Sequence, residues 1–202
     1  MAFFIKICGI KDAPTAISAF EAGASAVGLV FADSPRKVGV IQAREIVRAL
    51  PAELEVIGVF KDFSLDEIRA VLAEVELDAA QIHCNDGMIP EVDLGVELIP
   101  ALPADVLHEF DTRGMGQRRY VIDSPSGAGS GRAWDFAKAQ ATTRGQRMIL
   151  AGGLRADNVA LAIEQSKPWG VDVSSGVEVE RGTKSVSLIR EFIQVALKAS
   201  TA

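Results

Sequence analysis

Eight short apolar segments recur along the chain, and stretches with a helical pattern separate most of them. Strands that alternate with helices pack as parallel neighbours joined by right-handed crossovers. This pattern leaves two architectures, an open doubly wound sheet and a closed eight-stranded barrel. The predicted strands are residues 4–8, 26–30, 55–60, 79–83, 96–99, 119–123, 147–151 and 170–173.

The connections carry the signals of helix ends. Ser64 and Glu67 have the spacing of a capping box at the start of the third helix, and Pro51 ends the second. The fourth connection is short and contains Pro90, so its helix is expected to be weak or absent. The predicted helices are residues 13–22, 40–50, 65–74, 105–110, 134–141, 156–165 and 185–198.

The number of strands favours a closed (β/α)₈ (TIM) barrel. Most of the strands are apolar almost throughout, as expected when one face packs inside a barrel and the other packs under helices. A barrel of this kind typically takes about 250 residues. At 202 residues, of which 49% are hydrophobic, the chain is expected to form a single compact barrel domain over residues 1–202, with short fourth and fifth helices.

Charge and composition exclude several classes of function. The net charge is −6, and the 21 Lys and Arg residues are scattered, which argues against a nucleic-acid partner. No apolar run approaches the ~20 residues that cross a bilayer, and the N-terminus lacks the pattern of a secretion signal. Cys8 and Cys84 are too few for a disulfide framework, so both are expected to be free thiols. We therefore expect a cytoplasmic protein without a membrane partner.

In a parallel barrel, functional side chains lie where the strands end at their carboxyl side. The segments that follow the strands here contain several polar, charged and glycine residues that would meet at one mouth. They are Cys8, residues 31–37, Lys61, His83, Asp123, Gly152, Gly153 and residues 174–176.

The turns after the seventh and eighth strands indicate a phosphate site. Gly152 and Gly153 follow the seventh strand, and Ser174, Ser175 and Gly176 follow the eighth. Glycine lets an anion approach backbone N–H groups, and serine hydroxyls add donors. Either turn alone could be an ordinary loop, but the two together favour phosphate.

Cys8 and Asp123 are candidates for a base and an acid. Cys8 could equally be a small buried apolar residue, and as a base it needs nearby positive charge, which Lys6 or Arg36 could supply. Asp123 could instead cap a loop. To act as an acid, its pKa must be raised by apolar surroundings, or its proton must be delivered only in the complex.

Six motifs spread over the whole chain resemble the phosphoribosylanthranilate isomerase family of tryptophan biosynthesis. The segments at residues 6–10, Lys-Ile-Cys-Gly-Ile, and 171–178, Val-Asp-Val-Ser-Ser-Gly-Val-Glu, are each specific. The other segments are residues 58–60, 81–83, 129–136 and 152–154.

The resemblance implies a cofactor-independent and metal-independent Amadori rearrangement of a small phosphoribosyl substrate. N-(5-phosphoribosyl)anthranilate would become 1-(2-carboxyphenylamino)-1-deoxyribulose 5-phosphate, with Cys8 as general base and Asp123 as general acid. Arg36 would recognise the anthranilate carboxylate, although the residue alone could be a solvated loop charge. The resemblance also places Gly152, Gly153, Ser174, Ser175 and Gly176 at the phosphate.

The sequence leaves two possible roles for each of two further residues. Asp172 could orient the site or contact a ribose hydroxyl, and His83 could contact substrate or hold the end of the fourth strand. The chain departs from the family pattern at Cys84, where glycine is usual, and at Pro100, where lysine is usual. A proline there removes a positive charge and a backbone donor.

Alternative functions remain at this point. One is a related phosphosugar isomerase of the histidine pathway, or a version serving both pathways, although such enzymes are expected to carry aspartate where this chain has Cys8. Another is a non-catalytic barrel that binds a phosphorylated ligand. The protein is expected to be a monomer or a homodimer.

Overall fold

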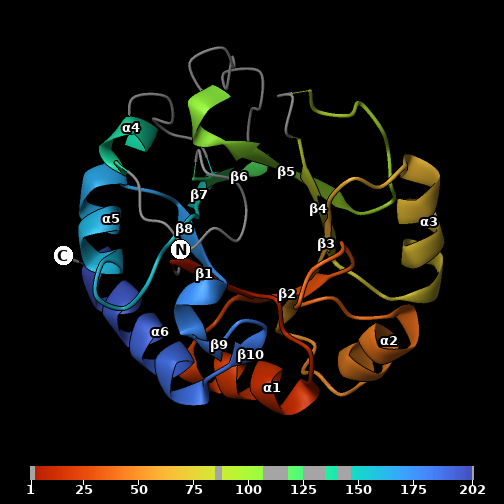
Figure 1. The fold of residues 1–202 in the computed structure, drawn as a ribbon, viewed down its shortest axis with the longest axis horizontal. Coiled ribbons are helices and arrows are strands. Elements are labelled where there is room, and N and C mark those ends of the chain that lie inside the picture. The colour runs from red at the N-terminus through yellow and green to blue at the C-terminus, as the bar shows by residue number, and fades with distance from the viewer. Residues whose placement is uncertain (1–2, 85–87, 107–117, 125–134, 141–146, 202) are drawn as a thin grey trace.

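The predicted (β/α)₈ barrel is confirmed by a computed structural model, which describes residues 3–84, 88–106, 118–124, 135–140 and 147–201. Eight parallel strands close into one barrel, and Figure 1 shows the helices arranged around it. The barrel closes where β1 pairs with β8, with Lys6 opposite Asp172. The strands are β1 (Phe4–Cys8), β2 (Ala26–Val30), β3 (Glu55–Phe60), β4 (Ala79–His83), β5 (Glu97–Pro103), β6 (Arg119–Asp123), β7 (Arg147–Leu150) and β8 (Gly170–Val173).

Local sequence explains the best-formed helix ends. Asp12 accepts a hydrogen bond from the backbone N–H of Thr15 at the start of the first helix, and the predicted capping box of Ser64 and Glu67 is present. None of the helices in the described part of the chain is long and apolar enough to cross a membrane. The α-helices are α1 (Ala13–Ala22), α2 (Val40–Arg48), α3 (Leu65–Glu74), α4 (Ala137–Gln140), α5 (Val159–Ser166) and α6 (Val186–Ser200).

The structure describes only part of the fourth and fifth connections, for which weak or short helices were predicted. Residues 88–96 contain no helix, as predicted for the described part of the fourth connection. The predicted helix at residues 105–110 is present only as a 3₁₀ turn, η1 (Ala104–Val106), and its remaining residues lie outside the described part of the chain. Residues 134 and 141 of the predicted helix at 134–141 also lie outside it.

β5 is longer than predicted. The prediction ended this strand at Ile99, but the ladder continues to Pro103 although Pro100 cannot donate a hydrogen bond. Pro100 lies opposite Ile82 of β4, and the next residue, Ala101, lies opposite both His83 and Val121. One missing donor therefore leaves the neighbouring pairs intact.

A short hairpin after β8 was not predicted. A 3₁₀ turn, η3 (Ser175–Val177), leads into β9 (Glu178–Glu180), which pairs antiparallel with β10 (Thr183–Lys184). Gly182 forms the turn with a φ of 90°, a conformation that favours glycine. The hairpin brings Glu178 and Lys184 back to the end of β8.

Alternation along each strand divides the barrel into an inner and an outer layer. The outward side chains of β1, such as Ile5 and Ile7, belong to the larger apolar core under the helices. The inward side chains fill a smaller core inside the barrel, made of Phe4, Ala26, Ile57, Ala79, Ile99, Ala101, Val121, Ile149 and Ala151. Residues two positions further along a strand therefore continue the lining toward its carboxyl end.

An ion cluster lies at the amino-terminal end of the barrel interior. Arg119, at the start of β6, donates to Glu55 at 2.7 Å through Nη1 and to Glu97 at 3.1 Å through Nε. Its guanidinium also lies 5.5 Å from the centre of the Phe4 ring. Because Glu55 and Glu97 start β3 and β5, the arginine joins three strands.

We predict that Arg119→Met lowers the free energy of unfolding by about 2–3 kcal/mol. Removal of the shared cation leaves two carboxylates without a partner, and the loss is below the ~3–5 kcal/mol of a fully buried pair because Glu97 is partly exposed. Urea denaturation measures the change. Arg118→Met, at the exposed neighbouring residue, is the matched control and should stay within about 0.5 kcal/mol of wild type. Equal effects of the two substitutions would contradict a structural role for the cluster.

Candidate active site

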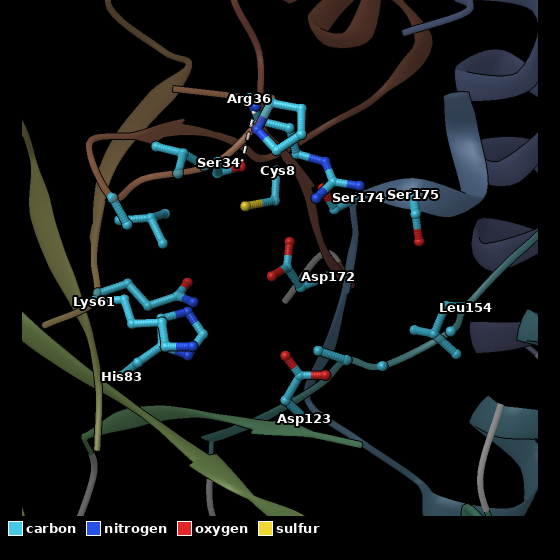
Figure 2. A pocket seen from close by; sticks show the side chains of 18 of the residues that line it. Cys8, Ser34, Arg36, Lys61, His83, Asp123, Leu154, Asp172, Ser174 and Ser175 are labelled. Carbon is cyan, nitrogen blue, oxygen red and sulfur yellow. Dashed lines mark hydrogen bonds between the residues drawn. The ribbon is translucent and has the colours of Figure 1, made fainter. Parts of the chain in front are cut away.

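A cavity of about 310 Å³ opens at the carboxyl-terminal ends of the barrel strands. All of the predicted site residues except Gly176 line it: Cys8, Arg36, His83, Asp123, Gly152, Gly153, Asp172, Ser174 and Ser175. Figure 2 shows that these side chains approach the cavity from several strands around the barrel. The structure thus brings together residues that lie far apart in the sequence.

Cys8 and Asp123 face the cavity from opposite walls (Figure 2). Cys8 ends β1 and Asp123 ends β6. Burial, together with the Asp172 carboxylate, raises the pKa of Asp123 to about 6. A hydrogen bond from the backbone N–H of Ser124 opposes this rise. Asp123 is therefore protonated in a much larger fraction near neutral pH than an ordinary aspartate, although the ionised form still predominates at pH 7.

Cys8 has a buried thiol with positive charge close by. Burial raises its pKa, whereas the ammonium groups of Lys6 and Lys184 lower it and the Asp172 carboxylate raises it. Gly28 of β2 leaves room for this arrangement, because a β-carbon there would lie 3.0 Å from Cys8 Sγ and 3.1 Å from Lys6 Nζ. The two cations favour the thiolate, and burial limits it in the free protein.

A layer of polar side chains lies one step deeper in the barrel than Cys8. Lys6, Gln81 and Asp172 each precede a residue of the mouth by two positions, namely Cys8, His83 and Ser174, so they point inward from β1, β4 and β8. Lys6 is fully buried and donates to Asp172 Oδ2 at 3.0 Å. Asp172 and Gln81 also line the cavity, so this layer forms part of its floor.

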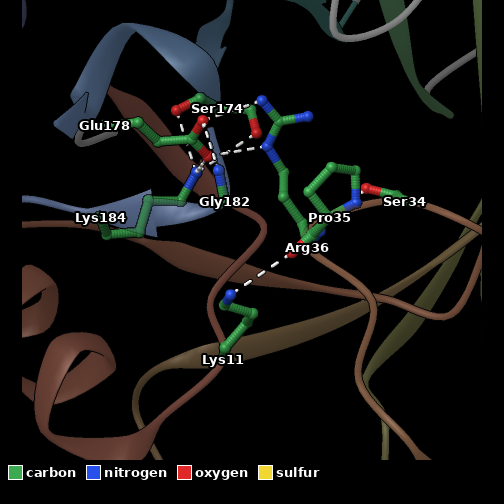
Figure 3. Close-up of polar contacts among 8 residues, drawn as sticks. All are labelled: Lys11, Ser34, Pro35, Arg36, Ser174, Glu178, Gly182 and Lys184. Carbon is green, nitrogen blue, oxygen red and sulfur yellow. Dashed lines mark hydrogen bonds and ion pairs between the residues drawn. The ribbon is translucent and has the colours of Figure 1, made fainter. Parts of the chain in front are cut away.

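Arg36 belongs to an ion-pair network rather than to the solvent (Figure 3). Its Nε and Nη2 donate to the two carboxylate oxygens of Glu178 at 2.7 Å and 2.9 Å. Although burial opposes it, hydrogen bonds from Arg36 and Lys184 hold the pKa of Glu178 at about 2. A guanidinium has five N–H donors, so three have no partner among the described residues and remain for a ligand in the cavity.

Lys184 extends the network to the end of β8. Its Nζ donates to Glu178 Oε1 at 2.7 Å and to the backbone carbonyl of Ser174 at 2.9 Å (Figure 3). Lys11 holds the other side of the network by donating to the carbonyl of Pro35 at 3.3 Å. The loop that carries Arg36 is thereby connected to the turn that carries Ser174.

Both glycines after β7 have backbone conformations that other residues rarely adopt. Gly152 and Gly153 have φ of 88° and 67°. A β-carbon on Gly152 would also lie 2.9 Å from Asp123 Oδ1, so this glycine lets the turn pack against the β6 end. Gly176 lies behind the cavity wall, where a β-carbon would overlap the carbonyl oxygen of Leu154. Its predicted phosphate contact stays a prediction.

His83 ends β4 and faces the cavity near Lys61 (Figure 2). Burial, together with the positive charges of Lys6 and Lys61, lowers the pKa of His83 to about 4. The Asp62 carboxylate has a small opposite effect on this pKa. The imidazole is therefore neutral at pH 7 and offers one donor and one acceptor.

Comparison with known proteins assigns the family. The model of the N-(5′-phosphoribosyl)anthranilate isomerase family matches residues 5–195. The N-(5′-phosphoribosyl)anthranilate isomerase of Pelobacter propionicus is 39% identical over 199 residues, which cover 95% of this chain and 94% of the relative. The chain belongs to the phosphoribosylanthranilate isomerase family. The enzyme of the same name from Pseudomonas aeruginosa is also 39% identical, over 94% of this chain and 92% of its own length.

Solved structures of the phosphoribosylanthranilate isomerase family have the same fold. The enzyme from Thermotoga maritima superposes with a TM-score of 0.83 at 32% identity, over 97% of this chain and 98% of that one. A phosphoribosylanthranilate isomerase in complex with reduced 1-(o-carboxyphenylamino)-1-deoxyribulose 5-phosphate superposes with a TM-score of 0.82 at 31% identity, over the same shares of the two chains.

The sequence interpretation missed several residues of this site. Gln81 was not singled out, and neither Glu178 nor Lys184 was expected beside Arg36. A signal existed for the first: the residue two positions before each strand end faces the same side as the end itself. No comparable signal existed for the other two, because the hairpin that returns them to the site is a tertiary feature.

We predict that Asp123 titrates near pH 6 in the free protein. Carbon-13 NMR of labelled aspartate carboxyls should show this midpoint, with the signal identified by its loss in Asp123→Asn. A raised pKa also means that the protonated group stabilises the fold below pH 3.8, and this contribution is lost as the pH rises through about 6. The stability of Asp123→Asn should lack that pH dependence, and a midpoint near 4 would contradict the effect of burial.

Proposed function

We propose that this chain isomerises N-(5′-phosphoribosyl)anthranilate to 1-(2-carboxyphenylamino)-1-deoxyribulose 5-phosphate, as its family does. One observation carries the residue assignment: a buried thiol and a carboxyl group with a pKa of about 6 face each other across a single cavity. Arg36 and two glycine and serine turns line the same cavity.

Asp123 acts as the general acid. Ring opening breaks the bond between C1′ and the ring oxygen of the ribofuranose, and the departing oxygen takes a proton from Asp123. The anthranilate nitrogen supplies the electron pair that forms the iminium. The apolar surroundings of Asp123 keep a proton available for this step near neutral pH.

Cys8 acts as the general base. The iminium acidifies the hydrogen on C2′, and the Cys8 thiolate removes it to form an enolamine, which ketonises to the product. Lys6 and Lys184 supply the positive charge that favours the thiolate. Because burial raises the pKa of the thiol, the thiolate is a minor form in the free protein and is generated for the bound substrate.

The two ends of the substrate occupy opposite parts of the cavity. The free N–H donors of Arg36 bind the anthranilate carboxylate, and Glu178 holds the guanidinium in place. The phosphate binds to backbone N–H groups of Gly152 and Gly153 and to Ser174 and Ser175, beside the charge of Lys184.

The other expectations stay predictions. They are that the protein is located in the cytoplasm and that it is a monomer or a homodimer. The Thermotoga maritima enzyme is described as dimeric. Membership of the phosphoribosylanthranilate isomerase family, together with Cys8 where the histidine-pathway enzymes are expected to carry aspartate, favours this activity over the alternatives.

We predict that Cys8→Ser and Asp123→Asn each lower kcat by about 10²–10⁴-fold, the range typical of a lost general base or acid. The fluorescence of N-(5′-phosphoribosyl)anthranilate, generated by a coupling transferase from anthranilate and phosphoribosyl pyrophosphate, follows the reaction. Cys84→Ala is the matched control, because this second thiol is buried in the outer core. Wild-type rates in either active-site variant would remove its assigned role.

We predict that Arg36→Ala weakens binding of the reduced product by about 10–100-fold, because a charge-assisted bidentate contact is lost. Binding of an analogue with aniline in place of anthranilate should change by less than about 3-fold, since it has no carboxylate to lose. Isothermal titration calorimetry measures both. Glu178 keeps Lys184 and the Gly182 N–H as partners in this variant, so the site should stay folded. Equal losses for both ligands would point to a purely structural role.

A further inference from the structure

Gln81 carries a buried amide at the floor of the cavity. Its side chain points into the barrel from β4, it is 3% exposed, and it lines the cavity. Among the described residues, its Oε1 has no hydrogen-bond partner. A buried acceptor without a partner costs about 1–3 kcal/mol, so a fold retains one where something else supplies the donor.

Asp172 presents a second acceptor of the same kind. It is 8% exposed and lines the same cavity. Its Oδ2 accepts from Lys6, but its Oδ1 has no partner in the described part of the chain. The ion pair fixes the direction of the carboxylate, which Figure 2 shows between Cys8 and Asp123.

The chemistry of the substrate limits what can satisfy these two acceptors. A ligand that fills the cavity excludes water from its floor and must bring its own donors. An ionised carboxylate has only acceptors, and so does a phosphate dianion. The donors that remain are the hydroxyl groups of the pentose and the anilino N–H.

The positions of the two charged ends favour the hydroxyls. The carboxylate is assigned to Arg36, after β2, and the phosphate to the turns after β7 and β8. Asp172 lies in the floor of the cavity between Cys8 and Asp123, where the pentose must lie for proton transfer (Figure 2). Gln81 forms part of the same floor from β4.

We propose that Gln81, together with Asp172 Oδ1, forms a subsite for the hydroxyl groups of the pentose. Gln81 is thereby a substrate-binding residue that selects a hydroxylated chain. The inference rests on the proposed function, since it takes the two ends of the substrate as bound to Arg36 and to the phosphate turns.

The decisive variant is Gln81→Met, which keeps the volume of the side chain and removes the amide. Because the amide oxygen has no partner among the described residues, the melting temperature should stay equal or rise. The value of kcat/KM should fall by about 10–100-fold, because the hydroxyl loses its partner in the filled cavity. Opposite directions of stability and activity distinguish a binding role from a structural one.

Ile82→Met is the matched control. Ile82 is the next residue of β4 and faces the outer core rather than the cavity, so kcat/KM should match wild type. Gln81→Leu repeats the test with a second apolar side chain. If neither Gln81→Met nor Gln81→Leu folds, the amide is needed by the free protein and the inference is wrong.

Two ligands separate the hydroxyl contact from every other contact. One is reduced 1-(o-carboxyphenylamino)-1-deoxyribulose 5-phosphate, and the other carries a plain five-carbon chain between the same anthranilate and phosphate. By calorimetry, Gln81→Met should bind the first about 10–100-fold more weakly than wild type and the second within about 3-fold. Equal changes for both ligands, or none, would overturn the subsite. An inactive wild-type protein would instead overturn the proposed function.

Discussion

The ion pair between Lys6 and Asp172 joins the first strand of the barrel to the last. The two residues are 166 positions apart in the sequence and lie opposite each other in the ladder that closes the barrel. A buried ion pair contributes little net stability, because desolvation offsets the attraction, but the loss of one partner typically costs about 3–5 kcal/mol. The pair therefore specifies which strands meet more than it stabilises their meeting.

The same pair contributes to the electrostatics of the site. The ammonium group lies beside Cys8 and lowers the pKa of its thiol, whereas the carboxylate raises the pKa of Asp123 on the opposite wall. A thiolate and a protonated carboxyl group are the forms that the isomerisation needs. Burial is the largest influence on both pKa values, and the pair that closes the barrel adds to it.

A second network joins the two ends of the cavity. Arg36, Glu178 and Lys184 form a continuous chain of ion pairs from the loop after β2 to the carbonyl of Ser174 at the end of β8. The group assigned to the carboxylate and the turn assigned to the phosphate are consequently held at a constant separation. Such rigid spacing suits a substrate with an anion at each end.

The sequence alone was enough to predict the barrel, most of its strands and nine of the residues that line the cavity, because alternating apolar runs and strand-end residues are local patterns. It did not determine how far β5 runs past Pro100, nor the hairpin that returns Glu178 and Lys184 to Arg36. Those features, and the absence of a partner for the buried Gln81 among the described residues, were decided by the tertiary structure. The physical reason is that ion pairing, burial and unmet hydrogen bonds depend on which distant strands become neighbours, and barrel closure alone establishes that.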